Sequence, residues 1–176
     1  MRLEGNRIVL TEMTDSDTKD IVRWRNQDFV RRMFLYQEPF TCEGHRSWIK
    51  NMIETGKAVQ FIIREKDTGN KIGSVYLRDI DRVNLKAEFG IFIGEEDKLG
   101  CGYGKEAAKL ITEYGFLNLG LNKIFLRVVA ENERARKSYK RAGFTEEGLL
   151  KEDRIINGEK KDLIFMAKFA GEKGKK

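Results

Sequence analysis

The chain has 176 residues, of which 40% are hydrophobic, so it can bury one core but is short for two domains. Its 34 basic and 28 acidic residues give a net charge of +6 and a mixed surface without a basic stripe or recognition module, which excludes a typical nucleic-acid-binding protein. No segment has the pattern of a signal peptide, and no apolar run approaches the roughly 20 residues that cross a bilayer. We therefore expect a cytoplasmic protein with no membrane partner.

The N-terminal part of the chain begins with a strand pattern and continues with helix patterns. Residues 6–13, NRIVLTEM, alternate in the manner of a β-strand. Residues 14–34 open with cap-forming side chains and carry apolar residues at helical spacing, which predicts one or two helices. After the break at Pro39, residues 41–54 predict another helix, and Gly56 ends it.

Three strand patterns follow in close succession. Residues 58–66 and 71–80 are joined by DTGN at 67–70, which is typical of a tight turn, and residues 86–94 form the third pattern. Because the links are short, we expect an antiparallel meander.

The C-terminal part alternates between helix and strand patterns. A helix after residue 102 ends at Gly120. Residues 122–130 predict a strand, residues 132–144 a short basic helix, and two final strands flank the Asn-Gly turn at 157–158. The first of these helices has one predicted core face, made by Ala107, Leu110, Ile111, Tyr114 and Leu117.

A glycine-rich segment, KLGCGYGK at residues 98–105, lies directly before that helix. Glycines allow the backbone to approach a ligand closely, and the first amides of a helix attract anions. The segment therefore predicts a site for a phosphate-bearing molecule.

Two common phosphate-binding motifs fit this segment poorly. In a P-loop, Ser or Thr follows the Gly-Lys pair, whereas Glu106 follows here and Leu99 occupies the place of the first glycine. A dinucleotide fingerprint is nominally present at Gly102, Gly104 and Ala107, but hairpins precede it and polar residues separate the strand from the glycines. Both readings are disfavoured.

The segment instead resembles the acetyl-CoA loop of the GNAT family of N-acetyltransferases. That signature is Arg or Gln, two residues, Gly, any residue, then Gly or Ala; Gly102 and Gly104 match it, and Leu99 stands where Arg or Gln is usual. Three longer segments resemble family motifs in the expected order, in the branch that includes ribosomal-protein, spermidine and amino-sugar acetyltransferases. They are residues 87–111, 128–144 and 146–169.

This resemblance implies an α+β fold with one GNAT-like domain. We expect a mostly antiparallel central sheet with a splayed cofactor cleft, flanked by helices, over residues 1–170, followed by a basic tail at 171–176. The implied activity is direct transfer of the acetyl group of acetyl-CoA to a primary amine, without a metal. A non-catalytic acyl-CoA-binding module is the competing interpretation.

Two residues are candidates for the chemistry. Glu88 matches a position where relatives carry an acidic residue that removes the amine proton through water; alternatively it is an exposed strand residue paired with a lysine. Tyr139 matches a tyrosine that protonates the departing thiolate; alternatively it only packs.

The resemblance also assigns residues to the cofactor. The backbone of Phe92 and Ile93 is expected to pair with the pantetheine arm, as an added strand would. Asn132 is expected to bond the same arm, to cap the next helix, or both. Lys137 is a candidate for the nucleotide phosphate. The residues expected around the diphosphate are Leu99, Gly100, Cys101, Gly102, Tyr103, Gly104 and Lys105.

The acceptor is less well defined. Trp24 is expected in the core, whereas Arg25 and Asn26 are candidates for contact with the acceptor. The sequence favours a nucleotide-linked amino sugar, then a peptide or protein N-terminus, and then a polyamine such as spermidine. A homodimer is one candidate assembly.

Cysteine and histidine provide no alternative site. Cys42 and Cys101, with the single His45, make neither a disulfide framework nor a metal cluster. Cys101 as a covalent nucleophile is disfavoured because a phosphate loop lies far from the thioester. We expect His45 to make a local hydrogen bond, with acceptor binding as the minority interpretation.

Overall fold

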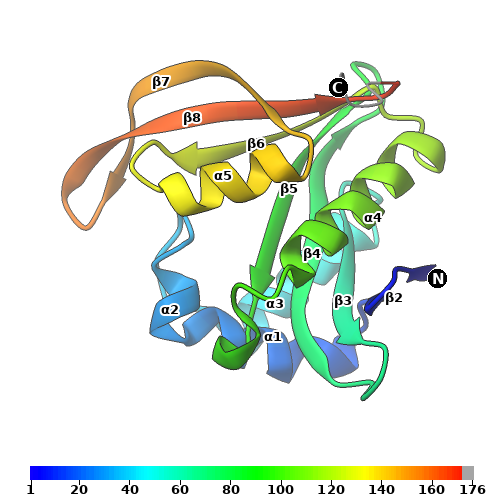
Figure 1. The fold of residues 1–176 in the computed structure, drawn as a ribbon. Coiled ribbons are helices and arrows are strands. Elements are labelled where there is room, and N and C mark those ends of the chain that lie inside the picture. The colour runs from blue at the N-terminus through cyan, green and yellow to red at the C-terminus, as the bar shows by residue number, and fades with distance from the viewer. Residues whose placement is uncertain (172–176) are drawn as a thin grey trace.

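One sheet forms the centre of the molecule (Figure 1). The computed structural model describes residues 1–171, and within them the strand order is β1-β2-β3-β4-β5-β6-β8-β7. All neighbouring strands are antiparallel except β5 and β6. The strands are β1 Arg2–Glu4, β2 Ile8–Glu12, β3 Val59–Glu65, β4 Lys71–Asp81, β5 Lys86–Ile93, β6 Lys123–Val129, β7 Thr145–Ile156 and β8 Glu159–Phe169.

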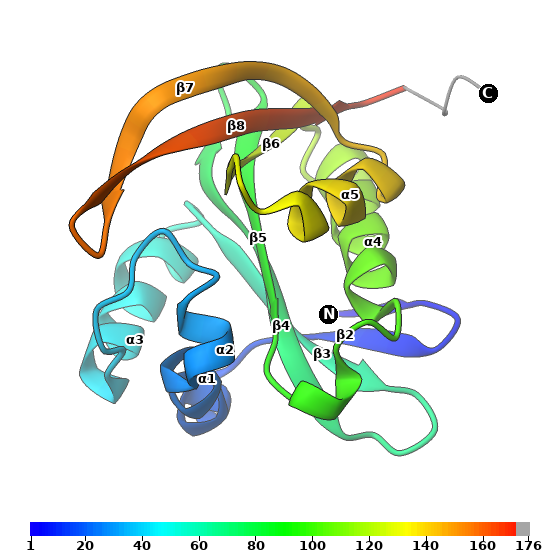
Figure 2. The same cartoon turned by 60° about the vertical axis from the view of Figure 1, so that its left-hand side comes forward.

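Helices cover both faces of the sheet (Figure 2). One face carries α1, α2 and α3, and the other carries α4 and α5. The long β7–β8 hairpin overhangs the α1–α3 face at its turn end. The helices are α1 Thr18–Asn26, α2 Asp28–Arg31, α3 Cys42–Trp48, α4 Tyr103–Leu117 and α5 Glu133–Arg141; a π turn at Ile49–Ile53 follows α3, and 3-10 turns lie at Asp15–Asp17 and Glu96–Lys98.

The alternation of side chains along the strands divides the core in two. In β3, Phe61 and Ile63 belong to the larger cluster beneath α4, whereas Ile62 belongs to the smaller cluster beneath α1. Trp24 is fully buried in the smaller cluster, as predicted, and Ile111 of α4 is fully buried in the larger one. The two faces are therefore separate packing layers.

The fold confirms the predicted α+β class, the meander of β3, β4 and β5, and the glycine loop before a helix. It differs at β1, a strand of three residues that the sequence did not predict. Leu117 was predicted in the core but is 83% exposed, because it lies about 80° around the helix from Ala107. The predicted basic tail lies outside the described residues except for Gly171.

Candidate active site

The two parallel strands at the centre of the sheet separate after a short paired segment. β5 and β6 pair only from Lys86 to Glu88 and from Lys123 to Phe125, respectively. From Phe89 onward β5 has no strand partner on the β6 side within the described chain, whereas β6 stays paired with β8 along its outer edge. A cavity of about 810 Å³ lies at this divergence. The sheet therefore contains the splayed cleft that the sequence analysis expected.

The glycine loop connects β5 to α4 at the edge of this cleft. Gly102 caps α4 with a left-handed backbone (φ +86°). The first amides of an α-helix have no acceptor within the helix, and no side chain caps those of α4. Arg7 fixes the loop from outside, because its Nη1 donates to the carbonyl of Cys101 at 2.9 Å. Glu106 accepts from the backbone N–H of Arg7 at 2.9 Å. The loop is thus held open with its amides free for an anion.

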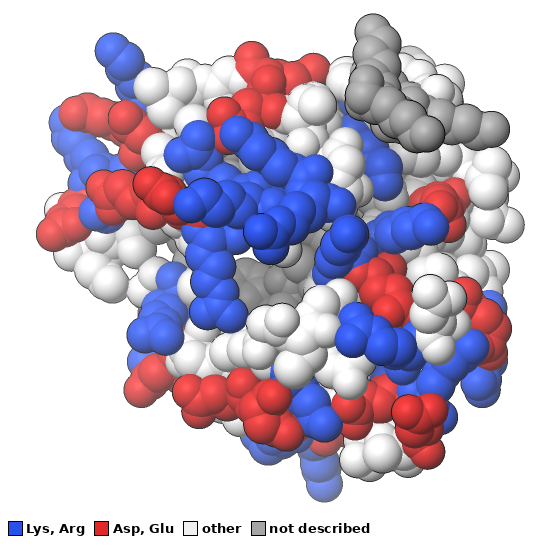
Figure 3. All heavy atoms as spheres, viewed as in Figure 1, with Lys and Arg blue, Asp and Glu red and all other residues white. Residues whose placement is uncertain are grey.

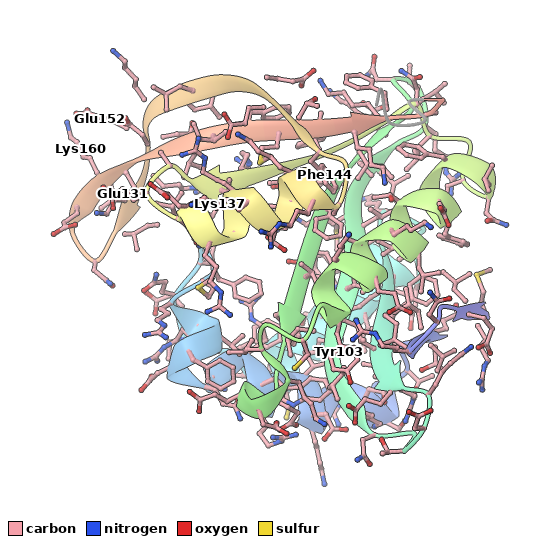
Figure 4. The ribbon with its side chains drawn as sticks, in the orientation of Figure 1. Tyr103, Glu131, Lys137, Phe144, Glu152 and Lys160 are labelled. Atoms are coloured by element: carbon pink, nitrogen blue, oxygen red, sulfur yellow. The ribbon has the colours of Figure 1, made fainter. Side chains whose placement is uncertain are left out.

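The Tyr103 side chain leaves the loop in the direction of β3. Its hydroxyl donates to Glu65 Oε1 at 2.9 Å, and Lys98 Nζ lies 2.9 Å from the same oxygen. Figure 4 shows Tyr103 at the start of α4. The side chain of Tyr103 therefore holds the loop against β3, and only its backbone N–H is available to a diphosphate.

Basic side chains gather over α5, beside the cleft (Figure 3). The α5 sequence is ERARKSYKR, with five basic residues in nine. The Asn132 side chain accepts from Ala135 N at 3.1 Å and caps this helix, which was the second of its two predicted roles. Lys137 pairs with Glu133 at 3.1 Å on the solvent side of α5 (Figure 4). The helix places a field of positive charge along one wall of the cleft.

Tyr139 lies on α5 and forms part of the cavity wall. Its ring packs edge-on against Phe89 at 6.0 Å and lies 6.1 Å from Phe144. Burial, with a smaller contribution from the phenol of Tyr76, raises the pKa of Tyr139 to about 12. The hydroxyl therefore stays protonated at neutral pH and can act as a hydrogen-bond donor.

Tyr76 reaches the same cavity from β4. It lies opposite Gly90 in the register of β4 and β5, and a Cβ on Gly90 would lie about 2.2 to 2.4 Å from the ring and hydroxyl of Tyr76. Only glycine lets this ring cross β5. Burial raises the pKa of Tyr76, although Arg78 and Arg25 oppose the shift.

Glu88 is held between two arginines. Its Oε2 accepts from Arg78 Nη2 at 2.9 Å, and Arg127 Nε donates to Oε1 at 3.2 Å. Only 7% of the Glu88 side chain is exposed, so the expected exposed glutamate paired with a lysine is wrong in both respects. The sequence analysis missed these arginines because they come from β4 and β6 and meet Glu88 only through strand register.

The predicted site residues divide into two groups. The cavity is lined by Glu88, Tyr139, Phe92, Ile93, Leu99, Gly104, Asn132 and Arg25. The residues outside its lining are Gly100, Cys101, Gly102, Tyr103, Lys105, Lys137 and Asn26. Asn26 bonds the backbone of Phe40 in both directions, at 2.7 and 2.8 Å, so its amide holds a loop instead of facing the cavity.

The remaining reactive side chains lie elsewhere. Cys42 and Cys101 are free thiols. The described residues contain no group of three or more His, Cys, Asp or Glu side chains arranged to hold a metal ion. A helix with the length and apolarity of a membrane span is likewise absent from residues 1–171.

Comparison with known proteins gives a consistent result. A family model described as "Acetyltransferase (GNAT) domain" matches residues 7–145. Spermidine N(1)-acetyltransferase of Escherichia coli K12 is 43% identical over 165 residues, covering 94% of this chain and 87% of that protein. The putative ribosomal N-acetyltransferase YdaF of Bacillus subtilis is 33% identical over 164 residues, covering 90% and 87%.

Solved structures agree with the sequence comparison. The spermidine N-acetyltransferase of Vibrio cholerae, crystallised with CoA and spermine, matches with a TM-score of 0.85 and 27% identity over 93% of this chain and 95% of that one. A second structure of the same enzyme, described as dodecameric, matches with a TM-score of 0.80 and 27% identity over 94% and 95%.

Proposed function

This chain belongs to the GNAT family of acetyltransferases, and we propose that it transfers the acetyl group of acetyl-CoA to a primary amine of a small molecule. The observation that carries the proposal is the divergence of β5 and β6, with Tyr139 in the wall of the cavity between them. We assign this activity to residues 1–170 as one domain.

The chain's own groups fit a CoA thioester. The free amides at the start of α4 suit its diphosphate, and the basic face of α5 suits its further phosphate. The unpaired edge of β5 at Phe92 and Ile93 offers backbone groups to the pantetheine amides, in the manner of an added strand. Acetyl-CoA would then extend along β5 with its thioester near Tyr139.

The proposed chemistry is direct attack. The amine nitrogen bonds to the thioester carbonyl carbon, the carbon–sulfur bond breaks, and the proton lost by nitrogen balances the proton gained by the thiolate. Tyr139, protonated at neutral pH, donates to the sulfur as negative charge develops there. An aliphatic amine has a pKa near 10, so it must lose a proton before it attacks.

For Glu88, the geometry supports a positioning role more strongly than the base that we expected. Two guanidinium groups occupy both of its oxygens, which leaves little capacity for a water molecule. We propose that Glu88 orients Arg78 and Arg127 in the cavity wall and that water removes the amine proton.

For the acceptor, we propose a polyamine as the first class to test. The support is the set of relatives whose names state spermidine as substrate, including one that is 43% identical. This replaces the order of preference drawn from the sequence, in which the polyamine came third. A peptide N-terminus has only the ribosomal relative, named as putative, in its favour.

A second acceptor class has a structural observation in its favour. Six basic side chains and three acidic ones line the cavity. An excess of positive charge suits an amine that also carries a negative group, such as a nucleotide-linked amino sugar, better than it suits a polycation.

A panel of amines tests both classes. CoA release is measured with spermidine, amino-sugar nucleotides and N-terminal peptides, and acetyl-CoA binding is measured separately by calorimetry. Turnover of any of these amines supports the enzyme. Binding of acetyl-CoA with no turnover in the whole panel would identify an acyl-CoA-binding module instead.

We further propose that the chain assembles with copies of itself, because the Vibrio cholerae relative is described as dodecameric. Light scattering of the purified protein distinguishes a monomer, the homodimer that was one candidate assembly, and a larger oligomer. A monomer at micromolar concentration would contradict this proposal.

A further inference from the structure

Arg25 is a cation without a counter-ion in the cavity wall. It lies on α1, and its guanidinium carbon is 3.4 Å from the centre of the Phe34 ring and 5.0 Å from that of Phe40. Its Nε is buried and has no hydrogen-bond partner, and no carboxylate within residues 1–171 pairs with this side chain. A guanidinium in such surroundings is costly unless a ligand compensates its charge.

Other basic side chains of the cavity resemble Arg25 in lacking partners. Arg154 of β7 also has a buried Nε without a hydrogen bond, and Arg32, which follows α2, has no ion pair in the described chain. The three acidic side chains of the lining are already engaged, since Glu88 binds two arginines and Lys161 lies between Glu131 and Glu159. The positive charge at Arg25, Arg32 and Arg154 is therefore uncompensated.

These arginines lie on the face of the sheet opposite the proposed phosphate sites. Arg25 comes from α1 and Arg32 from the end of α2, whereas the α4 N-terminus and α5 lie across the sheet (Figure 2). Phe34, on which Arg25 stacks, contacts Phe92 in the smaller core cluster of the α1–α3 face. The phosphates of a CoA bound along α4 and α5 would therefore not meet this cluster.

We infer that the acceptor carries a negatively charged group, phosphate or carboxylate, and that Arg25 binds it, with Arg154 and Arg32 beside it. The planar guanidinium matches both groups by paired hydrogen bonds, and its stacking on Phe34 fixes the plane of the fork. This inference rests on the proposed acetyl transfer and selects the second acceptor class over the polyamine.

Pairs of amines with and without a negatively charged group test the inference. Glucosamine 6-phosphate is compared with glucosamine, a UDP-linked amino sugar with the free sugar, and β-alanine with propylamine; spermidine is assayed alongside. The first two pairs report phosphate and the third reports carboxylate. We expect kcat/KM to be at least about tenfold higher for the charged member of one pair or more.

Two variants locate this preference. Arg25→Met should lose most of that tenfold advantage, because kcat/KM should fall much further for the charged member of a pair than for the uncharged member. Its thermal stability should be unchanged or higher, because an unpaired cation is replaced by an apolar chain of similar length. Lys19→Met is the matched control: Lys19 is an exposed residue of the same helix outside the cavity lining, and its removal should leave the preference intact.

The outcomes separate this inference from the proposed function. Efficient acetylation of spermidine, no advantage for any charged member, and an unaffected Arg25→Met variant would overturn the inference and leave the acetyltransferase standing. No turnover of any amine by protein that binds acetyl-CoA would instead overturn the proposed function. An equal loss of the preference in Lys19→Met would also overturn the role given to Arg25, since the effect would then come from net charge alone.

Discussion

The two faces of the sheet use different means to build the two halves of the cleft. On the α4–α5 face, the groups offered to a ligand are mainly backbone amides, held by the turn at Gly102 and by the bond from Arg7 to Cys101. On the α1–α3 face, the groups offered are side chains, including Arg25 and Tyr76, brought together from a helix and a strand. We propose that the backbone groups bind CoA and that the side chains select the acceptor, and we call the α4–α5 side the cofactor half and the α1–α3 side the acceptor half.

The largest expected effect comes from removing the hydroxyl at the boundary between the halves. Tyr139→Phe keeps the ring contacts with Phe89 and Phe144 but removes the hydroxyl that we propose as the proton donor to sulfur. We expect kcat to fall by roughly 10² to 10⁴, the range for a positioned acid, with little change in acetyl-CoA affinity. Stopped-flow CoA release and calorimetry measure the two quantities.

The matched control for that variant is Tyr103→Phe. Its hydroxyl binds Glu65 outside the cavity, so its loss should affect the loop and not the chemistry. If Tyr139→Phe keeps full kcat, Tyr139 only packs against its neighbours and is not the acid that protonates the thiolate.

The next effect concerns the charge network of the acceptor half. Glu88→Gln leaves Arg78 and Arg127 without their shared carboxylate and should lower the free energy of unfolding by about 2–4 kcal/mol. This is less than for a fully buried pair, because 34% and 25% of the two arginine side chains remain exposed. Urea unfolding measures the loss.

The pH profile of Glu88→Gln separates positioning from base catalysis. If Glu88 only positions the two arginines, Glu88→Gln should lower stability and kcat but leave the shape of the kcat/KM profile against pH unchanged. Loss of the acidic limb of that profile would show that Glu88 is the base after all.

His45 of α3 makes the stability of the fold depend on pH. It is 1% exposed, its Nδ1 lies 2.9 Å from Thr18 Oγ1, and burial lowers its pKa from 6.5 to about 4, against the opposing effect of Asp15 and Asp17. The unfolded chain therefore takes up a proton near pH 6.5 and the folded chain only near pH 4. The contribution of His45 to the free energy of unfolding is therefore fully present above pH 6.5, and roughly 3 kcal/mol is lost as the pH falls to 4.

A variant without this proton isolates the effect. His45→Gln keeps a polar group near Thr18 but does not titrate, so its stability should vary less between pH 6.5 and 4 than that of the parent chain. Denaturant titrations at several pH values give the free energy of unfolding of both chains. If that free energy changes equally with pH in the variant and in the parent chain, the assignment to His45 is wrong.

The sequence predicted the conformation of the glycine loop and the helix after it, because the signals for both are local. The glycines at 100, 102 and 104, the helix that follows and the adjacent strand lie within one short segment, and turn chemistry alone restricts their conformation. Tyr139 and Asn132 likewise lie in one contiguous helix motif. The sequence did not indicate the direction of the Tyr103 side chain, because its partner Glu65 lies on a distant strand.

The acceptor half depended on contacts that local patterns do not encode. Arg78 and Arg127 meet Glu88 only because β4, β5 and β6 are neighbours in a particular register. Tyr76 enters the cavity because Gly90 lies opposite it. Neither contact can be predicted without knowing which strands pair and in what register. The sequence analysis therefore offered Glu88 as a base and did not predict its ion pairs with the two arginines.

The smallest expected effect tests whether backbone geometry defines the cofactor half. Gly102→Ala places a side chain at φ +86°, which costs about 1–2 kcal/mol for an L-residue, and its Cβ would lie 3.0 Å from the movable end of Arg7. We expect a melting temperature lower by roughly 2–8 °C and weaker binding of acetyl-CoA. Gly120→Ala is the matched control, because it also places a side chain on a left-handed backbone (φ +67°), but outside the cavity lining and with no atom within 4 Å of the new Cβ. If the two variants bind acetyl-CoA equally well, the left-handed turn is not what presents the amides, and the contrast between a backbone half and a side-chain half fails at its simplest point.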